Sequence, residues 1–449
     1  MRILPLLLAL ALAAFGDVKV EKIWSDDEIK AHESGEFLRF SLYKLEGNVT
    51  GATLLIVGGV HGDEPGGYFA PSILASRYKI NKGAVWVIPN LNAESIARSR
   101  RGLYGDMNRK FEKISATDRD ADMVREVKKI IVDPKVDLIL NLHDGHGFYR
   151  ERWESAIFNP RAWGQTIVID QKTLTDVKFG AMDEIAKRVA DKMSESLKEE
   201  HHFFRVRNTE TRYKDEQMQK SLTYFAVTNL KPAFAQETSK NIDALALKVE
   251  YQLRSIEEFM SVMGIEYERD FELSVKGLQA VLDNSGTLKI NDKISLELTE
   301  LRNILRFMPL RGGNKDRFVF DHPLGAVKPI DDRYDIFIGN KRVSSLYPQF
   351  FTDDCKLDKA AIAIDGVRVE KAIGETFEVK NEFKIEPIEN VRVNVIGFSA
   401  KGTQNESAIA IAKKNMVARF SEDVRGAIYR VEFYRGDDFC GMINAKFVK

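Results

Sequence analysis

The chain has 449 residues, of which 44% are hydrophobic and 30% are charged, a composition that is ordinary for a globular protein. A chain of this length exceeds what one hydrophobic core usually organises, so we expect two or three domains. Lys and Arg together number 67, as do Asp and Glu, so no overall charge would attract nucleic acid or an anionic membrane, and we expect no nucleic-acid partner.

The N-terminal residues have the pattern of a secretory signal peptide. Arg2 supplies a positive charge, residues 4–14 form an apolar run, and small residues follow as far as Gly16. A run of about 11 residues is too short to span a bilayer, but it suits the apolar region of a signal peptide. The alternatives are a buried N-terminal strand and an uncleaved anchor. Because no later stretch is apolar enough to cross a membrane, we expect the mature protein, without residues 1–16, in the periplasm.

Residues 17–263 predict an α/β domain. Apolar runs that end in polar residues are expected to be buried strands, and they lie at 54–57, 85–88, 138–141 and 233–235. Between them, helical spacing without helix breakers marks residues 121–131 and 181–199. Such alternation favours a mixed, mostly parallel sheet with helices on both faces.

The pattern changes after residue 263. One helical pattern remains, at 295–307. Otherwise short alternating stretches, separated by turn signals, predict strands, and they lie at 317–320, 334–338, 391–395 and 429–433. We expect two small β-rich domains, at 264–345 and 346–449. The second, with about seven short strands, fits a β-sandwich.

Cys355 and Cys440 are the only cysteines. An oxidising compartment permits a disulfide between them, but two residues 85 positions apart carry no signal of a disulfide framework. Whether they are bonded is left open by the sequence. Neither cysteine has the spacing of a metal site.

Chemically useful residues follow the apolar runs of the first domain. His61 and Glu64 lie three positions apart in a glycine-rich segment directly after the run at 54–57. This spacing lets an imidazole nitrogen and a carboxylate reach one cation at about 2.0–2.2 Å. The alternative is a surface turn that caps the next helix. In open α/β sheets, sites form beyond the carboxyl ends of strands, which favours the metal site.

His143 follows the run at 138–141 and would complete a set of two histidines and one carboxylate. Such a set leaves a fourth position open, as a catalytic zinc ion requires. His146 is the competing ligand, but it lies further out in the loop, so we predict His143.

Two further segments contain groups that suit a substrate and a base. Asn108 and Arg109 lie side by side and can hold a carboxylate, Arg109 by a two-point fork. For Arg98 and Arg100 in the same segment we expect only a solvated basic loop. Glu237 follows the run at 233–235 and either caps a helix or acts as a general base beside the metal.

Taken in order, the motifs at 58–67, 106–109, 141–143 and Glu237 resemble those of zinc carboxypeptidases of the carboxypeptidase A type. The related aspartoacylases and succinylglutamate desuccinylases share much of the pattern. The resemblance covers about residues 40–250. It implies a zinc ion held by three ligands, namely His61, Glu64 and His143.

The same resemblance implies roles for the other site residues. Asp106 would orient His61, and Arg101 would polarise the scissile carbonyl. Asn108 and Arg109 would bind the terminal carboxylate of the substrate, and Glu237 would be the base and later the acid. The family's substrate-capping tyrosine has two candidates here, Tyr213 and Tyr224.

Over its whole length the chain resembles the D,L-carboxypeptidases that trim peptidoglycan in helical bacteria. These enzymes have a small β-barrel and an immunoglobulin-like domain behind the catalytic domain. The resemblance implies the muropeptide substrate L-Ala-γ-D-Glu-meso-diaminopimelate, a dipeptide product and an effect on cell shape. Two alternatives remain, an N-acyl amino-acid amidohydrolase of the aspartoacylase type and a non-catalytic cell-wall-binding protein.

Overall fold

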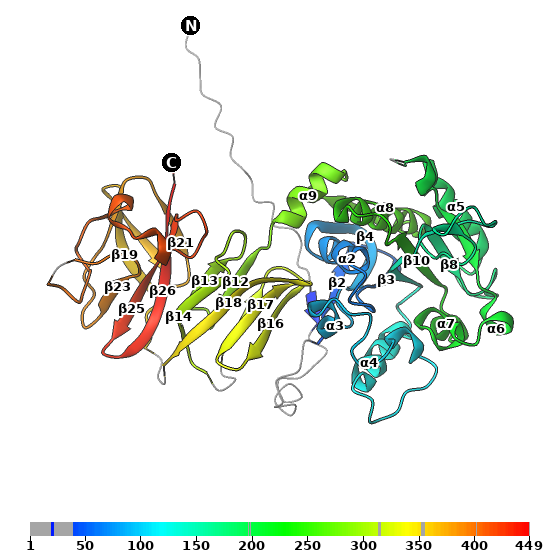
Figure 1. Cartoon of the computed structure of the whole chain (residues 1–449), viewed down its shortest axis with the longest axis horizontal. Coiled ribbons are helices and arrows are strands. Elements are labelled where there is room, and N and C mark those ends of the chain that lie inside the picture. The colour runs from blue at the N-terminus through cyan, green and yellow to red at the C-terminus, as the bar shows by residue number, and fades with distance from the viewer. Residues whose placement is uncertain are drawn as a thin grey trace, which may run out of the picture.

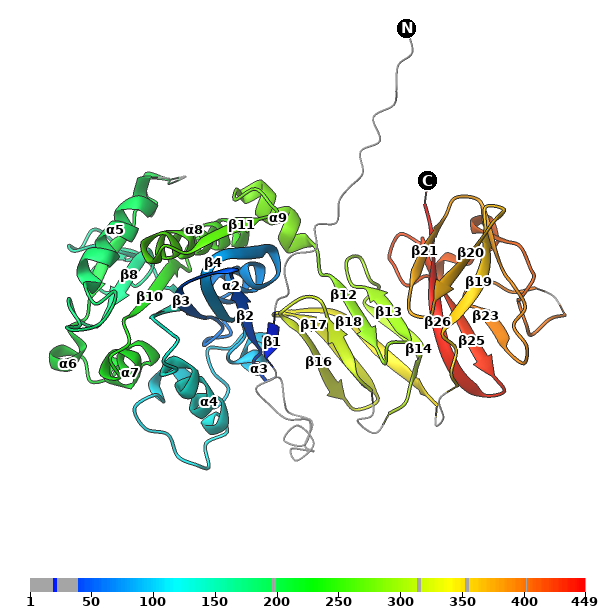
Figure 2. The same cartoon turned by 180° about the vertical axis from the view of Figure 1, so that it is seen from behind.

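The structure is a computed structural model that describes residues 19–21, 39–195, 197, 199–312, 316–351, 355–400 and 402–448. The expected signal peptide, residues 1–16, lies outside these residues. Figures 1 and 2 show three parts in a row. A helix-covered sheet lies at one end, a group of strands in the middle, and a second group of strands with the C-terminus at the other end.

Nine of the described strands form the sheet of the first part, in the order β1-β2-β4-β3-β5-β10-β8-β9 with β11 paired to β4. Its four central strands are mutually parallel: β4 (Tyr78–Ile88), β3 (Val49–Val57), β5 (Leu138–Gly145) and β10 (Ala233–Ser239). The outer strands are β1 (Lys19–Glu21), β2 (Leu42–Glu46), β8 (Thr166–Ile169), β9 (Arg205–Asn208) and β11 (Glu266–Arg269). The predicted mixed sheet with a parallel centre is confirmed, as are all four predicted strands.

Helices cover both faces of this sheet (Figure 1). On one face lie α2 (Gly66–Arg77), α5 (Met182–Glu195) and α8 (Leu245–Met263), and on the other α4 (Ala121–Ile131) and α7 (Leu222–Thr228). The helices predicted at 121–131 and 181–199 are confirmed as α4 and α5. The buried residues of α4 recur every three or four positions, as an amphipathic helix requires: Ala121, Val124, Val127 and Ile131.

The middle part consists of two sheets. The first contains β12 (Thr287–Ile290), β13 (Ile294–Glu297) and β15 (Phe318–Phe320). The second contains β14 (Ile304–Leu310), β16 (Gly325–Ile330), β17 (Arg333–Ile338) and β18 (Lys341–Phe350). The strands predicted at 317–320 and 334–338 are confirmed as β15 and β17.

The helix predicted at 295–307 is wrong, because this segment contains most of β13 and the start of β14. Leu296 and Leu298 alternate with polar residues and are buried, as in a strand with one face toward the core. Leu296 also pairs with Leu288 of β12. Pairing and burial of this kind outweigh the helical spacing of the leucines along the segment.

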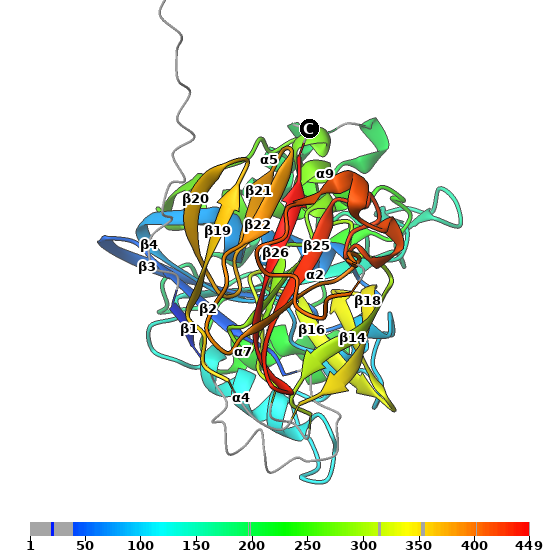
Figure 3. The same cartoon turned by 90° about the vertical axis from the view of Figure 1, so that its left-hand side faces the viewer.

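The last part consists of two four-stranded sheets around one apolar core (Figure 3). One sheet contains β19 (Lys359–Ile364), β20 (Val367–Ala372), β22 (Glu382–Ile385) and β24 (Ile411–Ala412). The other contains β21 (Thr376–Val379), β23 (Arg392–Val395), β25 (Ile428–Arg435) and β26 (Asp438–Phe447). The strands predicted at 391–395 and 429–433 are confirmed as β23 and β25. Cys355 and Cys440, left open by the sequence, form a disulfide.

The first two parts share one apolar core, which includes Val57 of β3 and Leu288 of β12. Residues of the last part, such as Met442 of β26, also join this core. The three parts are therefore packed against one another rather than joined by free linkers. Among the described residues, none of the helices combines the length and the apolar character needed to cross a bilayer.

Candidate metal centre

The turn after β3 is held in place by its backbone. Gly58 N–H donates to Ile88 O at the end of β4, at 2.7 Å, and Asn92 N–H donates to Gly59 O at 2.8 Å. Gly59 has a φ of 69°, a conformation that favours glycine. The turn thus fixes the two residues that follow it, His61 and Glu64, at the carboxyl edge of the sheet.

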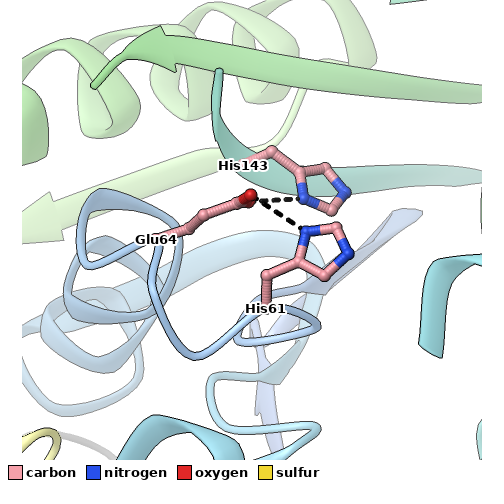
Figure 4. A group of neighbouring side chains, drawn as sticks. All are labelled: His61, Glu64 and His143. Atoms are coloured by element: carbon pink, nitrogen blue, oxygen red, sulfur yellow. Dashed lines mark hydrogen bonds and ion pairs between the residues drawn. The ribbon is translucent and has the colours of Figure 1, made fainter. Parts of the chain in front are cut away.

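His61, Glu64 and His143 meet at this edge (Figure 4). His61 Nδ1 lies 3.0 Å from Glu64 Oε1, and His143 Nδ1 lies 2.8 Å from Glu64 Oε2. All three residues are buried, and each offers a ligand atom within 4.8 Å of the others. Burial opposes a charge on Glu64, but the two histidines hold the pKa of its carboxyl well below the usual value.

The donor set and its surroundings fit a divalent cation. Asp106 Oδ1 lies 2.8 Å from His61 Nε2. In a neutral imidazole this contact places the proton on Nε2 and leaves Nδ1 to bind a cation. His61 Nδ1 is buried and has no hydrogen-bond partner among the described residues. Two imidazole nitrogens and one carboxylate converging on one point match the ligands of a catalytic zinc site. His146 is exposed and does not belong to the group.

Strand register brings Glu237 to the same place. In the parallel pair of β10 and β5, Glu237 lies opposite His143 and Thr238 lies opposite Asp144. Burial, followed by the nearby Glu64 carboxylate, raises the pKa of the Glu237 carboxyl well above its usual value. A cation at the three ligands would favour the ionised form again. Glu237 is therefore a partly buried carboxyl group beside the ligands.

Arg101 lies against the ligands and is about half exposed, at 48%. Its Nη1 donates to Glu64 Oε1 at 3.0 Å, and its Nη2 lies 3.0 Å from Asp106 Oδ2. One guanidinium group thus contacts both the proposed ligand Glu64 and the residue that orients His61.

Asn108 and Arg109 lie in a 3-10 turn, Met107–Arg109, that begins after Asp106. The buried Asn108 accepts the Leu222 N–H on its Oδ1 at 2.9 Å, so its amide nitrogen is the group left for a ligand. Arg109 Nη1 donates to Asn108 O at 2.9 Å. Leu222 begins α7, so this helix helps to fix the turn.

Four residues named in the sequence analysis remain: two arginines and the two tyrosines considered for the capping role. Arg98 pairs with Glu94 and, like Arg100, is exposed, as expected for a solvated loop. Of the two tyrosines considered for the capping role, Tyr213 is highly exposed and Tyr224 is partly buried in α7.

The sequence interpretation missed Lys240 and Asp63. Lys240 Nζ lies 2.7 Å from Asp63 Oδ2 and 3.6 Å from Glu64 Oε1, so this pair braces the turn that contains Glu64. The proximity of Lys240 to Glu237 along the chain was the available signal, since both follow the apolar run of β10.

The site also depends on close backbone packing at Gly62. A Cβ atom on this residue would lie 2.1 Å from the backbone carbonyl of Ser95, which cannot move aside as a side chain could. We expect Gly62→Ala to lower the free energy of unfolding by about 1–3 kcal/mol and to weaken metal binding, because His61 and Glu64 flank the displaced residue. Thermal unfolding and metal titration measure the two effects. Unchanged values in both would contradict this account of the turn.

Two histidines, a glutamate and a neighbouring carboxyl group at the ends of parallel strands define a metal-dependent hydrolase. Comparison with known families and structures narrows this class. Residues 28–283 match the catalytic domain of carboxypeptidases controlling helical cell shape, and residues 353–448 match the C-terminal domain of metallo-carboxypeptidases. The chain therefore belongs to the family of metallo-carboxypeptidases that control helical cell shape.

Solved structures of the cell shape determinant protein Csd4 from Helicobacter pylori are similar to the chain. The product-bound form is 35% identical, covers 91% of this chain and 100% of its own, and has a TM-score of 0.86. The tripeptide-bound form is 34% identical with the same coverage and TM-score. A form bound to mDAP, described as a D,L-carboxypeptidase, is 34% identical over 90% of this chain and all of its own, also with a TM-score of 0.86. A search among curated protein sequences gave no match.

Proposed function

We propose that the chain is a zinc-dependent D,L-carboxypeptidase. It would remove diaminopimelate from the peptidoglycan tripeptide L-Ala-γ-D-Glu-meso-diaminopimelate, leave the dipeptide and so affect cell shape. The observation that carries the proposal is the placement of Glu237 opposite His143, beside the other two ligands, His61 and Glu64. The tripeptide-bound and mDAP-bound forms of the similar Helicobacter pylori protein support the substrate.

Zinc is the proposed metal because the donor set is two imidazoles and one carboxylate. When bound, a zinc ion supplies a Lewis acid that polarises a carbonyl and acidifies water. The protein side chains do the rest. Glu237 takes a proton from the attacking water and then gives it to the leaving amine.

Arg101 lies where it can donate to the oxygen that becomes negatively charged during attack, since its guanidinium group already contacts Glu64. Asn108 and Arg109 are proposed to hold the terminal carboxylate of the substrate, Asn108 through its amide and Arg109 through its fork. Asp106 keeps the proton of His61 on Nε2.

If Asn108 and Arg109 hold a terminal carboxylate, the enzyme should require one. We expect the C-terminal amide of the tripeptide to be cleaved far more slowly than the free acid, and Arg109→Lys to raise KM for the acid because an ammonium group lacks the two-point fork. Steady-state kinetics on both substrates test this. Equal rates for acid and amide would replace the exopeptidase with an endopeptidase or an amidohydrolase.

The diaminopimelate specificity needs its own test. The tripeptide should be preferred over an analogue that ends in lysine, which lacks only the distal carboxylate. A site that pairs this carboxylate leaves its donors unsatisfied with lysine and should reject it by a factor on the order of 10⁴ in kcat/KM. A ratio near one would remove the diaminopimelate specificity and keep the carboxypeptidase.

The loop between β5 and β8 is rich in charged and aromatic residues. Its Arg150 is buried and donates to the Tyr149 and His201 carbonyl oxygens, so it supports the loop. Trp153 is exposed at 62%. Glu151 and Arg152 are exposed too. We propose no role for them in substrate recognition.

The two alternatives are weaker. A non-catalytic wall-binding protein has no need of the three ligands, the base and Arg101 in one place. An amidohydrolase of the aspartoacylase type does not account for two β-rich parts or for membership of the carboxypeptidase family.

We also propose the domain division expected from the sequence, with the catalytic domain at 17–263, a barrel-like domain at 264–345 and an immunoglobulin-like sandwich at 346–449. Strands β11 and β18 favour placing each boundary a few residues later, because β11 pairs with the catalytic sheet and β18 with the middle sheet. A periplasmic location after removal of residues 1–16 completes the proposal, and the disulfide between Cys355 and Cys440 fits an oxidising compartment.

A further inference from the structure

A large cleft lies between the middle and last parts of the chain. The middle part separates the last part from the catalytic sheet (Figures 1 and 2). Its volume is about 1200 Å³. One wall comes from residues 302–307, around the start of β14. The other comes from β23, β25 and residues 417–424. Ligand sites commonly enclose about 300–1000 Å³, so the cleft has room for a short peptide.

Five arginines line this cleft, which stands out in a chain without net charge: Arg302, Arg306, Arg392, Arg419 and Arg430. Two of them have structural partners. Arg302 Nε donates to Ser421 O at 2.9 Å, and Arg430 Nη1 lies 2.8 Å from Met308 Sδ.

The other three guanidinium groups have no acidic partner at ion-pair distance in the part of the chain that the structure describes. Each lies over an aromatic ring instead. The distances to the ring centroids are 4.8 Å for Arg306 over Tyr347, 4.5 Å for Arg392 over Tyr434 and 4.7 Å for Arg419 over Phe420. Stacking fixes the plane of a guanidinium group and leaves its edge for a two-point contact with a carboxylate.

Two acidic residues that line the cleft are buried. Glu422 and Glu432 are each 2% exposed, and the Oε1 atom of each has no hydrogen-bond partner among the described residues. The Glu432 oxygen lies 3.4 Å from Arg430 Nε. Asp437 is the third acid of the lining. The buried oxygens call for a donor from a ligand, such as an amine or an amide N–H.

The rim of the cleft is apolar. Of the fourteen exposed large hydrophobic residues among those described, five line it: Ile304, Phe307, Val417, Phe420 and Val424. Phe307 is the most exposed of these, at 69%. A concentration of exposed apolar side chains around a concave charged surface is typical of a binding site.

We propose that this cleft is a second, non-catalytic site that binds an acidic peptide, namely the peptide stem of peptidoglycan. The identity of the stem rests on the proposed function. A stem that ends in diaminopimelate has three carboxylates, one from D-Glu and two from diaminopimelate, and one free amine. The carboxylates match Arg306, Arg392 and Arg419, and the amine matches the buried carboxyl groups of Glu422 and Glu432.

A second site of this kind would keep the enzyme on the cell wall between cleavages. The chain has two positions for one type of ligand, the metal centre and the cleft, held apart by the packed middle part. Binding at one site raises the effective concentration of neighbouring stems at the other, without any new contact at the metal centre. The cleft therefore affects work on the polymer and leaves work on a free tripeptide unchanged.

The test measures binding to purified peptidoglycan sacculi by co-sedimentation, with the full chain carrying Glu237→Gln so that stems are not consumed. Adding Arg392→Gln and Arg419→Gln should weaken binding about tenfold or more, as expected for the loss of two charge-assisted contacts. The matched control is Arg368→Gln, which removes an exposed arginine of the same part outside the cleft, paired with Glu386. The control should bind like its parent.

Four results would overturn the proposal. The first two are unchanged sacculus binding in the double variant and an equal loss of binding in the control. The third is equal binding to sacculi stripped of their stems, and the fourth is a dimer, seen by light scattering, that the double substitution dissociates. The third would assign the cleft to the glycan strand and the fourth to a second copy of the chain. Turnover of the soluble tripeptide, measured with active Glu237, should not change in the double variant. If the parent fails to cleave the tripeptide, the proposed function fails, while sacculus binding still decides the role of the cleft.

Discussion

Glu237→Gln should leave the fold and the metal site intact and lower kcat on the tripeptide by a factor on the order of 10²–10⁴. Glutamine has the size of glutamate, so it fits the crowded space beside Gly145. A Cβ atom added to Gly145 would lie only 2.8 Å from Glu237 Oε2. An amide cannot accept the proton of the attacking water. The measurement is single-turnover cleavage of the tripeptide together with metal analysis of the same preparation.

The matched control is Glu184→Gln on the exposed side of α5, which removes one carboxylate far along the chain from the ligands. It should keep the rate of the parent. Turnover of Glu237→Gln within tenfold of the parent would assign the base to another group. Loss of the metal in Glu237→Gln would instead mean that Glu237 supports the ligands rather than the proton transfer.

Much of this site could be predicted because it is built from strand ends. His61, His143 and Glu237 each follow a short apolar run, and parallel strands in one sheet place their carboxyl ends at one edge. The sequence could not give the strand order, but any parallel arrangement of these runs gathers the same residues. Register then decides the details, and the pairing of Glu237 with His143 follows from it.

Contacts between distant segments were beyond the sequence. The ion pair of Lys240 with Asp63 joins residues 177 positions apart. The position of Lys240 shortly after Glu237 indicates that it lies near the site, but no local pattern identifies Asp63 as its partner. The disulfide between Cys355 and Cys440 is of the same kind. Such pairs follow from tertiary packing and not from periodicity, so only the assembled fold contains them.

The helix wrongly predicted at 295–307 has a related cause. Periodicity cannot decide a short segment whose leucines fit a helix as well as a strand. In the structure β13 pairs with β12, and β14 pairs with β18, a strand that begins 31 positions after β14 ends. The paired strands β14 and β18 also contribute to one wall of the arginine-lined cleft. Because this pairing joins segments that are distant along the chain, the cleft has no signature in the sequence.

His143→Ala should remove most of the metal and with it the activity. A catalytic zinc ion has three protein ligands, and loss of a buried imidazole leaves only His61 and Glu64. Elemental analysis of the purified variant measures occupancy, and far-UV circular dichroism shows whether the fold survives. His143→Gln, which fills more of the space, serves as a second variant in case the cavity left by alanine destabilises the buried end of β5.

The control for this prediction is His146→Ala, since His146 was the competing ligand in the sequence and lies exposed in the loop that follows β5. It should retain full metal occupancy and activity. If His146→Ala lost the metal and His143→Ala kept it, the ligand assignment would be reversed. Full occupancy in both His143 variants would mean that the cation binds elsewhere. Among the described residues, His61, Glu64 and His143 are the one group whose ligand atoms lie close enough together to hold an ion.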